Sequence, residues 1–176
     1  TFADNSMSTI NVTTLTPNGG ADVNPGNDRM IVEVAPRMSG NFVIALNGNP
    51  GAFNGFYPFM RQLATAGISG DVNVEVQAGT YTGEIVVPAI NATAGRVTIQ
   101  RRAGDKVTLT ETLYPLYQNY NQLESHTIVR ILGGGSNITL RDLTIQASAT
   151  SRVLSLVASE NAQDVILDKC TFIGND

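Results

Sequence analysis

The sequence has little of what most catalytic and nucleic-acid-binding sites are built from. It contains one cysteine, Cys170, so no disulfide can form within the chain. Its one histidine, His126, supports neither a metal site nor a catalytic triad by itself. Charged residues make up only 15% of the chain, and the 11 Lys and Arg residues form no basic stripe. This excludes the electrostatic footprint of a nucleic-acid-binding protein.

Long apolar runs are also missing. No stretch reaches the roughly 18 apolar residues that a membrane helix needs, so we expect no membrane span. What the chain does have is glycine, at 17 residues, together with valine, isoleucine, threonine and asparagine. β-Branched residues favour strands, and glycine and asparagine favour tight turns. The composition therefore indicates an all-β fold.

A ten-residue pattern occurs twice. "NITLRDLTIQ" (137–146) and "DVILDKCTFI" (164–173) align without a gap at a numbering offset of 27. The apolar residues of each copy are spaced by two, three and two positions, whereas a flat strand keeps a spacing of two. The extra residue predicts a bend between two short strands, at residues 141–142 in the first copy and 168–169 in the second.

A shorter repeat precedes this one. "IVRIL" (128–132) matches "VLSLV" (153–157) at a numbering offset of 25. Each period then has three short strands joined by bends that keep one apolar face inward, which is typical of a solenoid. We therefore predict a parallel β-helix, in which coils stack about 4.8 Å apart and complete one another's core.

The offset of 27 also predicts which side chains stack. Four inward residues of the first copy are expected to lie directly under four of the second. These are Ile138, Leu140, Leu143 and Ile145, under Val165, Leu167, Cys170 and Phe172. Because Cys170 takes the core position of Leu143, we expect it to be a buried, unreactive thiol.

The same offset places opposite charges side by side at the bend. Arg141 is expected beside Asp168, and Asp142 beside Lys169. Exposed pairs of this kind contribute about 0–1 kcal/mol each, so they set register more than they add stability. We prefer this interpretation to a catalytic one, because acid–base chemistry needs a cleft and tuned pKa values.

Earlier segments fit the scheme less regularly. Short β-branched strands are expected at 72–76, 84–87, 96–100 and 106–110, divided by turn segments such as "AGTYTG" (78–83). Glycine is expected at the corners, namely Gly79, Gly83, Gly95 and Gly104.

A helix is expected in "NGFYPFMRQLATAG" (54–67). Phe56, Phe59, Met60 and Leu63 share one face at helical spacing. Pro58 suits the first turn of a helix, and Gly67 suits its end. We expect this helix to cap the first coil of the solenoid, with its aromatic residues in the core rather than in a cofactor site.

The run from "SGNFVIALNGNPGAFNGFYPFMRQLATAGISG" through "DVNVEVQAGTYTGEIVVPAI" (39–90), with the later "SNITLRDLTI" (136–145), carries a family pattern. It resembles the start of right-handed parallel β-helix regions in large secreted surface proteins of Bacteroidota and relatives, often exported by the type IX route. The resemblance covers residues 39–176. It implies a right-handed helix and a secreted, cell-surface location, and it implies no particular activity.

The resulting domain organisation has two parts. Residues 1–38 form a leading β segment, and residues 39–176 form the capped start of the β-helix, with an inserted loop at 111–127. Because the chain stops just after a strand, we expect the β-helix to be truncated at its C-terminal end. The open edge would then be covered by further coils of the same polypeptide or by a neighbouring chain.

Two segments are candidates for binding. The insertion at 111–127 holds Tyr114, Tyr117 and Tyr120, which could stack on sugars or anchor a partner protein, or fold down on the solenoid wall. The stretch 22–33 has Asp22, Asn24, Asp28 and Glu33 at calcium-loop positions, but Asn27 stands where such a loop needs glycine, so we prefer a plain turn.

The sequence thus favours a non-enzymatic, extracellular structural or adhesive module that needs no cofactor and no metal. Its partners would be further coils, surface glycans or surface proteins. One alternative is a carbohydrate-active enzyme or sugar-binding module of pectate-lyase-like fold, which needs several carboxylates on one wall. Another is a self-assembling subunit of a surface filament.

Overall fold

The computed structural model describes residues 7–14, 24, 28–90, 95–111, 127–133, 137–148 and 155–174. One helix and fifteen short strands lie in these ranges. In chain order they are β1 (Ser8–Thr13), β2 (Arg29–Val34), β3 (Met38–Ala45), β4 (Phe53–Asn54), α1 (Phe56–Ala66), β5 (Ile68–Val76), β6 (Gly79–Thr82), β7 (Ile85–Val87), β8 (Val97–Arg101), β9 (Val107–Thr110), β10 (Thr127–Leu132), β11 (Ile138–Arg141), β12 (Thr144–Gln146), β13 (Ser155–Glu160), β14 (Val165–Asp168) and β15 (Thr171–Ile173).

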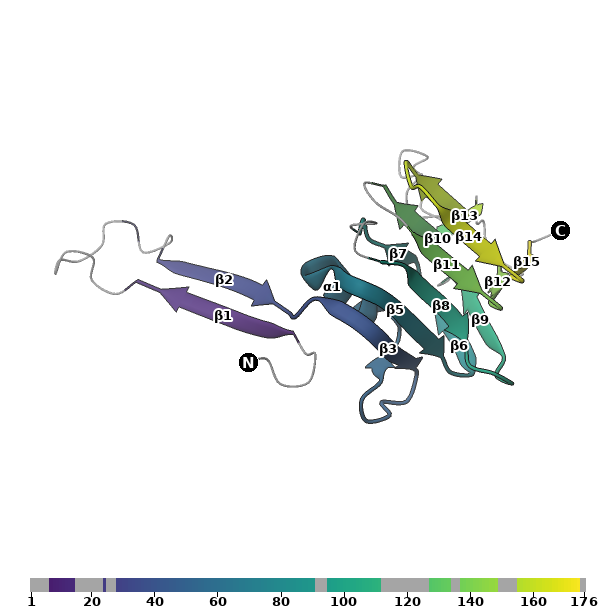
Figure 1. Ribbon diagram of the computed structural model, residues 1–176, viewed down its shortest axis with the longest axis horizontal. Coiled ribbons are helices and arrows are strands. Elements are labelled where there is room, and N and C mark those ends of the chain that lie inside the picture. Colours follow the sequence, from purple (N-terminus) through teal and green to yellow (C-terminus); the bar gives the residue numbers. More distant parts are fainter. Residues whose placement is uncertain are drawn as a thin grey trace.

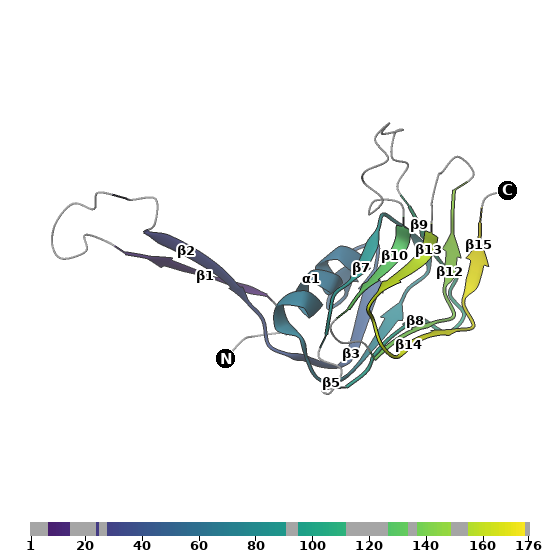
Figure 2. The ribbon, with the colours of Figure 1, turned by 90° about the horizontal axis from the view of Figure 1, so that it is seen from above.

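Thirteen of these strands form three parallel sheets that make the walls of a solenoid. Sheet I has the order β14-β11-β8-β5-β3-β4, sheet II the order β15-β12-β9-β6, and sheet III the order β13-β10-β7. The chain runs through sheets I, II and III in turn and then returns to sheet I one level higher. Figure 2 shows the three walls around the interior. The predicted fold class, an all-β parallel β-helix, is confirmed.

The register of sheet I shows how the coils repeat. Val72, Val97, Ile138 and Val165 pair in succession across β5, β8, β11 and β14. The number of residues between successive members of this column is largest between Val97 and Ile138. The coil that connects these two residues contains the predicted insertion at 111–127. A coil can grow this way because only its strands must match the neighbouring coils.

The predicted stacking of the two ten-residue copies is confirmed. Ile138 pairs with Val165, Leu140 with Leu167 and Ile145 with Phe172. The four inward residues of the first copy are at most 2% exposed. They belong to a continuous apolar core that extends from α1 to β12.

The bends of the repeat are confirmed as well. Asp142 and Lys169 adopt left-handed backbone conformations, with φ of 56° and 52°. Asn137 and Asp164, at the other end of β11 and β14, do the same with φ of 57° and 52°. Short polar side chains tolerate this conformation best, which explains the Asn and Asp residues at three of these four corners.

Glycine has a second, steric role at one corner. Gly95 has φ of 153°, and a Cβ atom there would lie 2.5 Å from the backbone carbon of Gly70 in the coil below. No side chain fits at that distance. This corner therefore allows the backbones of two coils to approach each other.

The predicted cap is formed by α1, which contacts β3, β4 and β7 at the N-terminal end of the stack. Its face of Phe56, Phe59, Met60 and Leu63 is buried. The ring of Phe59 meets Phe53 edge-on, with ring centroids 5.3 Å apart. Gly67 ends the helix, with its N–H donating to the carbonyl oxygen of Leu63 at 2.9 Å.

One segment predicted as a turn is a strand. Residues 78–83 contain β6, the first strand of sheet II. Tyr81 is only 4% exposed, and its hydroxyl donates to the carbonyl oxygens of Gln77 at 3.0 Å and Ile44 at 3.3 Å. Glycine at both ends of the segment suggested a turn. The alternation of an inward Tyr81 with the outward threonines on either side of it is instead the pattern of a strand.

The predicted offset of the shorter repeat is wrong. Val129 pairs with Val157, an offset of 28 in the numbering rather than 25. Five similar residues carry no information on turn length, so the similarity of 128–132 to 153–157 placed β13 too early in the chain. The observed register agrees closely with the offset of 27 in sheets I and II, as one continuous coil requires.

The leading segment forms an antiparallel hairpin of β1 and β2 that projects from the solenoid as an arm (Figure 1). Ile10, Val12 and Met30 share one face of this arm by register, and they are 48%, 50% and 62% exposed. Glu33 at the base of the arm pairs with Arg61 of α1.

We expect Leu140→Ala to destabilise the folded chain by about 2–5 kcal/mol, because it opens a cavity between two coils. Leu167→Ala is the matched control, since Leu167 occupies the same column but is 40% exposed. It should cost less than half as much. Urea unfolding followed by circular dichroism measures both, and equal losses would contradict the burial gradient along the column.

Candidate functional site

The charged side chains of the solenoid mostly bridge neighbouring coils. Nε of Arg141 lies 2.7 Å from Oδ2 of Asp168, as predicted. Asp142 and Lys169 lie at neighbouring register positions, as predicted, but Asp142 forms its ion pair with Arg101 of the coil before, at 3.9 Å. Arg101, Asp142 and Lys169 occupy one column, and the long guanidinium side chain of Arg101 reaches the carboxylate first.

Arg96 is the most connected of these residues. Its guanidinium donates to Oγ1 of Thr139 at 3.2 Å and to Oδ1 of Asn137 at 3.3 Å, and it pairs with Asp164 two coils away. Its backbone N–H donates to Oδ1 of Asp71 at 2.9 Å. One arginine therefore ties together polar residues of four successive coils at one corner.

Sheet III has a comparable bridge on its outer face. Nε of Arg130 lies 3.0 Å from Oε1 of Glu84, and Nη1 of Arg130 lies 3.6 Å from Oε1 of Glu160. The three residues belong to successive levels of this wall. Both carboxylates are thus engaged by the same cation, an arrangement that fixes register.

The structure describes few of the residues predicted for binding. Tyr114, Tyr117, Tyr120 and His126 lie outside the described residues, as do Asp22 and Asn27 of the calcium-like stretch. Asp28 accepts a hydrogen bond from Oγ1 of Thr14 at 2.9 Å, and Glu33 pairs with Arg61. Over the described ranges, no three His, Cys, Asp or Glu side chains gather in a group that could hold a metal ion.

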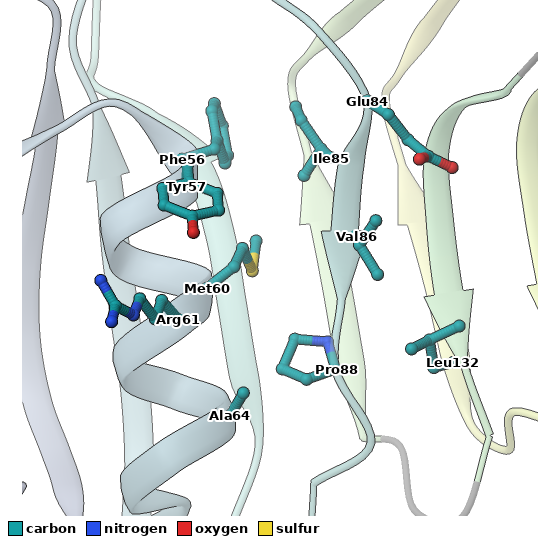
Figure 3. Close-up of a pocket in the computed structure, with 10 residues that line it drawn as sticks. All are labelled: Phe56, Tyr57, Met60, Arg61, Ala64, Glu84, Ile85, Val86, Pro88 and Leu132. Carbon is teal, nitrogen blue, oxygen red and sulfur yellow. The ribbon is translucent and has the colours of Figure 1, made fainter. Parts of the chain in front are cut away.

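A shallow groove runs between α1 and β7, with a volume of about 370 Å³ (Figure 3). Phe56 and Met60 of α1 face Ile85 across it, and Tyr57 at its rim is 76% exposed. Its two charged residues, Arg61 and Glu84, are paired with Glu33 and Arg130. The groove therefore lacks the convergent polar groups that orient a small ligand.

The clearest candidate interface is the last described coil, formed by β13, β14 and β15. Each of these strands pairs with a described strand on one side only. Ile166, Leu167, Phe172 and Ile173 are between 40% and 46% exposed. Unpaired strand edges above half-covered apolar side chains are a template for another strand. We call this surface the terminal coil.

Cys170 lies in the terminal coil and is only half-buried, so the prediction of a buried thiol is wrong in degree. The core position inferred from Leu143 is correct, but Cys170 has no described coil above it. Its Sγ donates to the carbonyl oxygen of Leu140 at 3.4 Å. Burial raises the pKa of the thiol, and the carboxylates of Asp142 and Asp168 add to this rise, which a hydrogen bond with the backbone of Leu143 only partly offsets.

The arm was missed as an exposed apolar surface. Its signal was present in the sequence, because alternate residues of β1 and β2 are apolar in "INV" and "MIVEV". That alternation indicates a face that packs on something, and Ile10, Val12 and Met30 of this face are exposed.

No helix of the described ranges has the length and apolarity to cross a bilayer.

Comparisons of the chain with protein-family profiles, with curated proteins and with solved structures found no match. The class of the protein therefore follows from its own geometry, which is that of a parallel β-helix.

We expect Cys170 to react slowly with a thiol reagent in the folded chain. A raised pKa leaves a smaller thiolate fraction at a given pH than in the unfolded chain, and the thiolate is the reactive form. Labelling with a chromogenic disulfide at mildly alkaline pH, with and without denaturing urea, measures the difference. Equal rates in the two states would show that the thiol is neither shielded nor shifted.

Proposed function

We propose that this chain is a non-enzymatic structural or adhesive β-helix module of a secreted bacterial surface protein. The observation that carries the proposal is the use of its charged residues. Of the ion pairs among described residues, those of Arg96, Arg101, Arg130 and Arg141 all join different levels of the stack. Within the described part of the chain, these charged residues hold the register of the coils, whereas acid–base catalysis needs groups with tuned pKa values in a cleft.

The sequence resemblance over residues 39–176 supports the location at a cell surface. The shape of the fold supports the role, because a solenoid gives a long and rigid body that can extend from its point of attachment. The arm and the terminal coil offer apolar contact surfaces at opposite ends of this body (Figure 1).

A direct test of the non-enzymatic role uses charged polysaccharides, the substrates of the enzyme alternative. We expect no cleavage of polygalacturonate or alginate, with or without calcium, when the chain is incubated with each and reducing or unsaturated ends are measured. Glu160→Gln should lower stability by about 0–1 kcal/mol, because its pair with Arg130 is partly exposed. Cleavage that this substitution abolishes would overturn the proposal.

We further propose that the terminal coil is covered in the assembled protein, by further coils of the same polypeptide or by a neighbouring chain. The N–H of Thr171 donates to the carbonyl oxygen of Leu143 at 2.9 Å. Since successive amides of a strand point to opposite sides, the N–H of Phe172 points to the open edge. A covering strand would use it.

Hydrogen exchange distinguishes these two amides in the isolated chain. We expect the Phe172 amide to exchange fast and the Thr171 amide to be protected. Sedimentation at several concentrations shows whether self-association protects Phe172. A stable monomer in which both amides are equally protected would contradict the proposed covering.

A further inference from the structure

The outer face of sheet II carries threonine at the same position in every coil. Thr80, Thr108, Thr144 and Thr171 pair in register across β6, β9, β12 and β15. The residue that follows each of them points into the core. The four side chains therefore form one outward column, which we call the threonine ladder.

A second outward column runs beside the ladder, two positions further along each strand. It consists of Thr82, Thr110, Gln146 and Ile173. None of the eight outward positions of the two columns is charged, whereas the outer faces of sheets I and III carry Arg141, Asp168 and Arg130. The strands of sheet II thus carry no outward charge, and the nearest charged column, with Lys106, Asp142 and Lys169, lies at the corner two positions before the ladder.

The hydroxyl groups of the ladder are free. Within the described ranges, none of the four makes a hydrogen bond, whereas Thr139 on sheet I accepts one from Arg96. Thr80 and Thr171 are exposed, and Thr108 and Thr144 are partly exposed. A row of unused donors and acceptors on a flat surface is available to order water or another hydrogen-bonding surface.

The spacing of this row is set by the backbone. Stacked strands lie about 4.8 Å apart, and the second column lies about 6.6 Å away along the strands. Water oxygens in hexagonal ice repeat along one lattice axis at nearly the first of these spacings. Each threonine also presents a methyl group beside its hydroxyl, so water on this face is held by regular hydroxyls between apolar ridges.

We propose that the outer face of sheet II is an ice-binding surface, with the threonine ladder as its contact row. The ligand is the ordered water lattice of ice. A neutral polysaccharide fits the face less well, because sugar rings are bound by stacking on aromatic side chains and none of the eight outward residues is aromatic.

The test compares two double variants of the chain. Thr108→Tyr with Thr144→Tyr puts two bulky rings in the middle of the ladder. Asn73→Tyr with Thr98→Tyr is the matched control, since these residues also lie side by side on adjacent coils but face outward from sheet I. Circular dichroism melting establishes that each variant folds.

The measurements are the fraction of protein that partitions into a slowly growing ice surface, and thermal hysteresis. We expect the parent chain and the sheet I control to enter the ice and to shape its crystals, and the ladder variant to be excluded. If the ladder variant does not fold, Thr144→Lys, which adds one solvated charge to the same row, should give the same loss.

Three outcomes would overturn the proposal. The first is exclusion of the parent chain from ice. The second is retention of ice affinity by a folded ladder variant, or its equal loss in the control. The third is binding to insoluble chitin or cellulose without any effect on ice, which would assign the face to a polysaccharide instead.

Discussion

The interaction on which the structure depends is the in-register stacking of inward apolar residues along one column. Val72, Val97, Ile138 and Val165 show it most simply, each covering the one below. A single coil has no closed core of its own, and its strands pair only with other coils. Each coil is therefore stable only between neighbours. Within the described residues, α1 covers one end of the stack, and the terminal coil has a neighbouring coil on one side only.

This constraint explains where the polar residues lie. Stacking of the apolar columns also stacks the corners of successive coils. A charged side chain at a corner therefore lies next to the side chains at the same corner of the coils above and below. Opposite charges in adjacent coils, such as Arg141 and Asp168, favour the correct register, and like charges would oppose it. Arg96 links more than two coils in this way, because its guanidinium contacts Asn137 and Thr139 of the next coil and Asp164 of the coil after that. The charged residues that first suggest chemistry in the sequence are thus explained by the needs of stacking.

The register of the coils could be predicted from the sequence only where the repeated segment includes a turn. The offset of 27 was predictable because ten aligned residues included a bend, which fixes both strands and their turn. The offset of 28 in sheet III was not, because five apolar residues include no turn. The strand β6 was hidden by its flanking glycines, and only the burial of Tyr81 reveals it. The half-exposure of Cys170 depends on what lies above it, which a repeat pattern does not contain. The predicted tyrosine site falls outside the described residues.

Outward positions are the ones that stacking leaves free to vary, so their composition carries the most information on function. Sheets I and III use theirs for charges that lock one coil to the next. Sheet II uses its eight outward positions for six threonines, one glutamine and one isoleucine, with no charge to set register. Threonine suits any strand, so strand propensity alone accounts for its presence on each wall. Propensity does not account for its recurrence at one register position over four coils, or for the absence of charge from the same wall while the other two walls carry it. The three walls have the same parallel-strand geometry but differ in the side chains on their outer faces. This difference is our reason for assigning a binding role to sheet II rather than to the walls beside it.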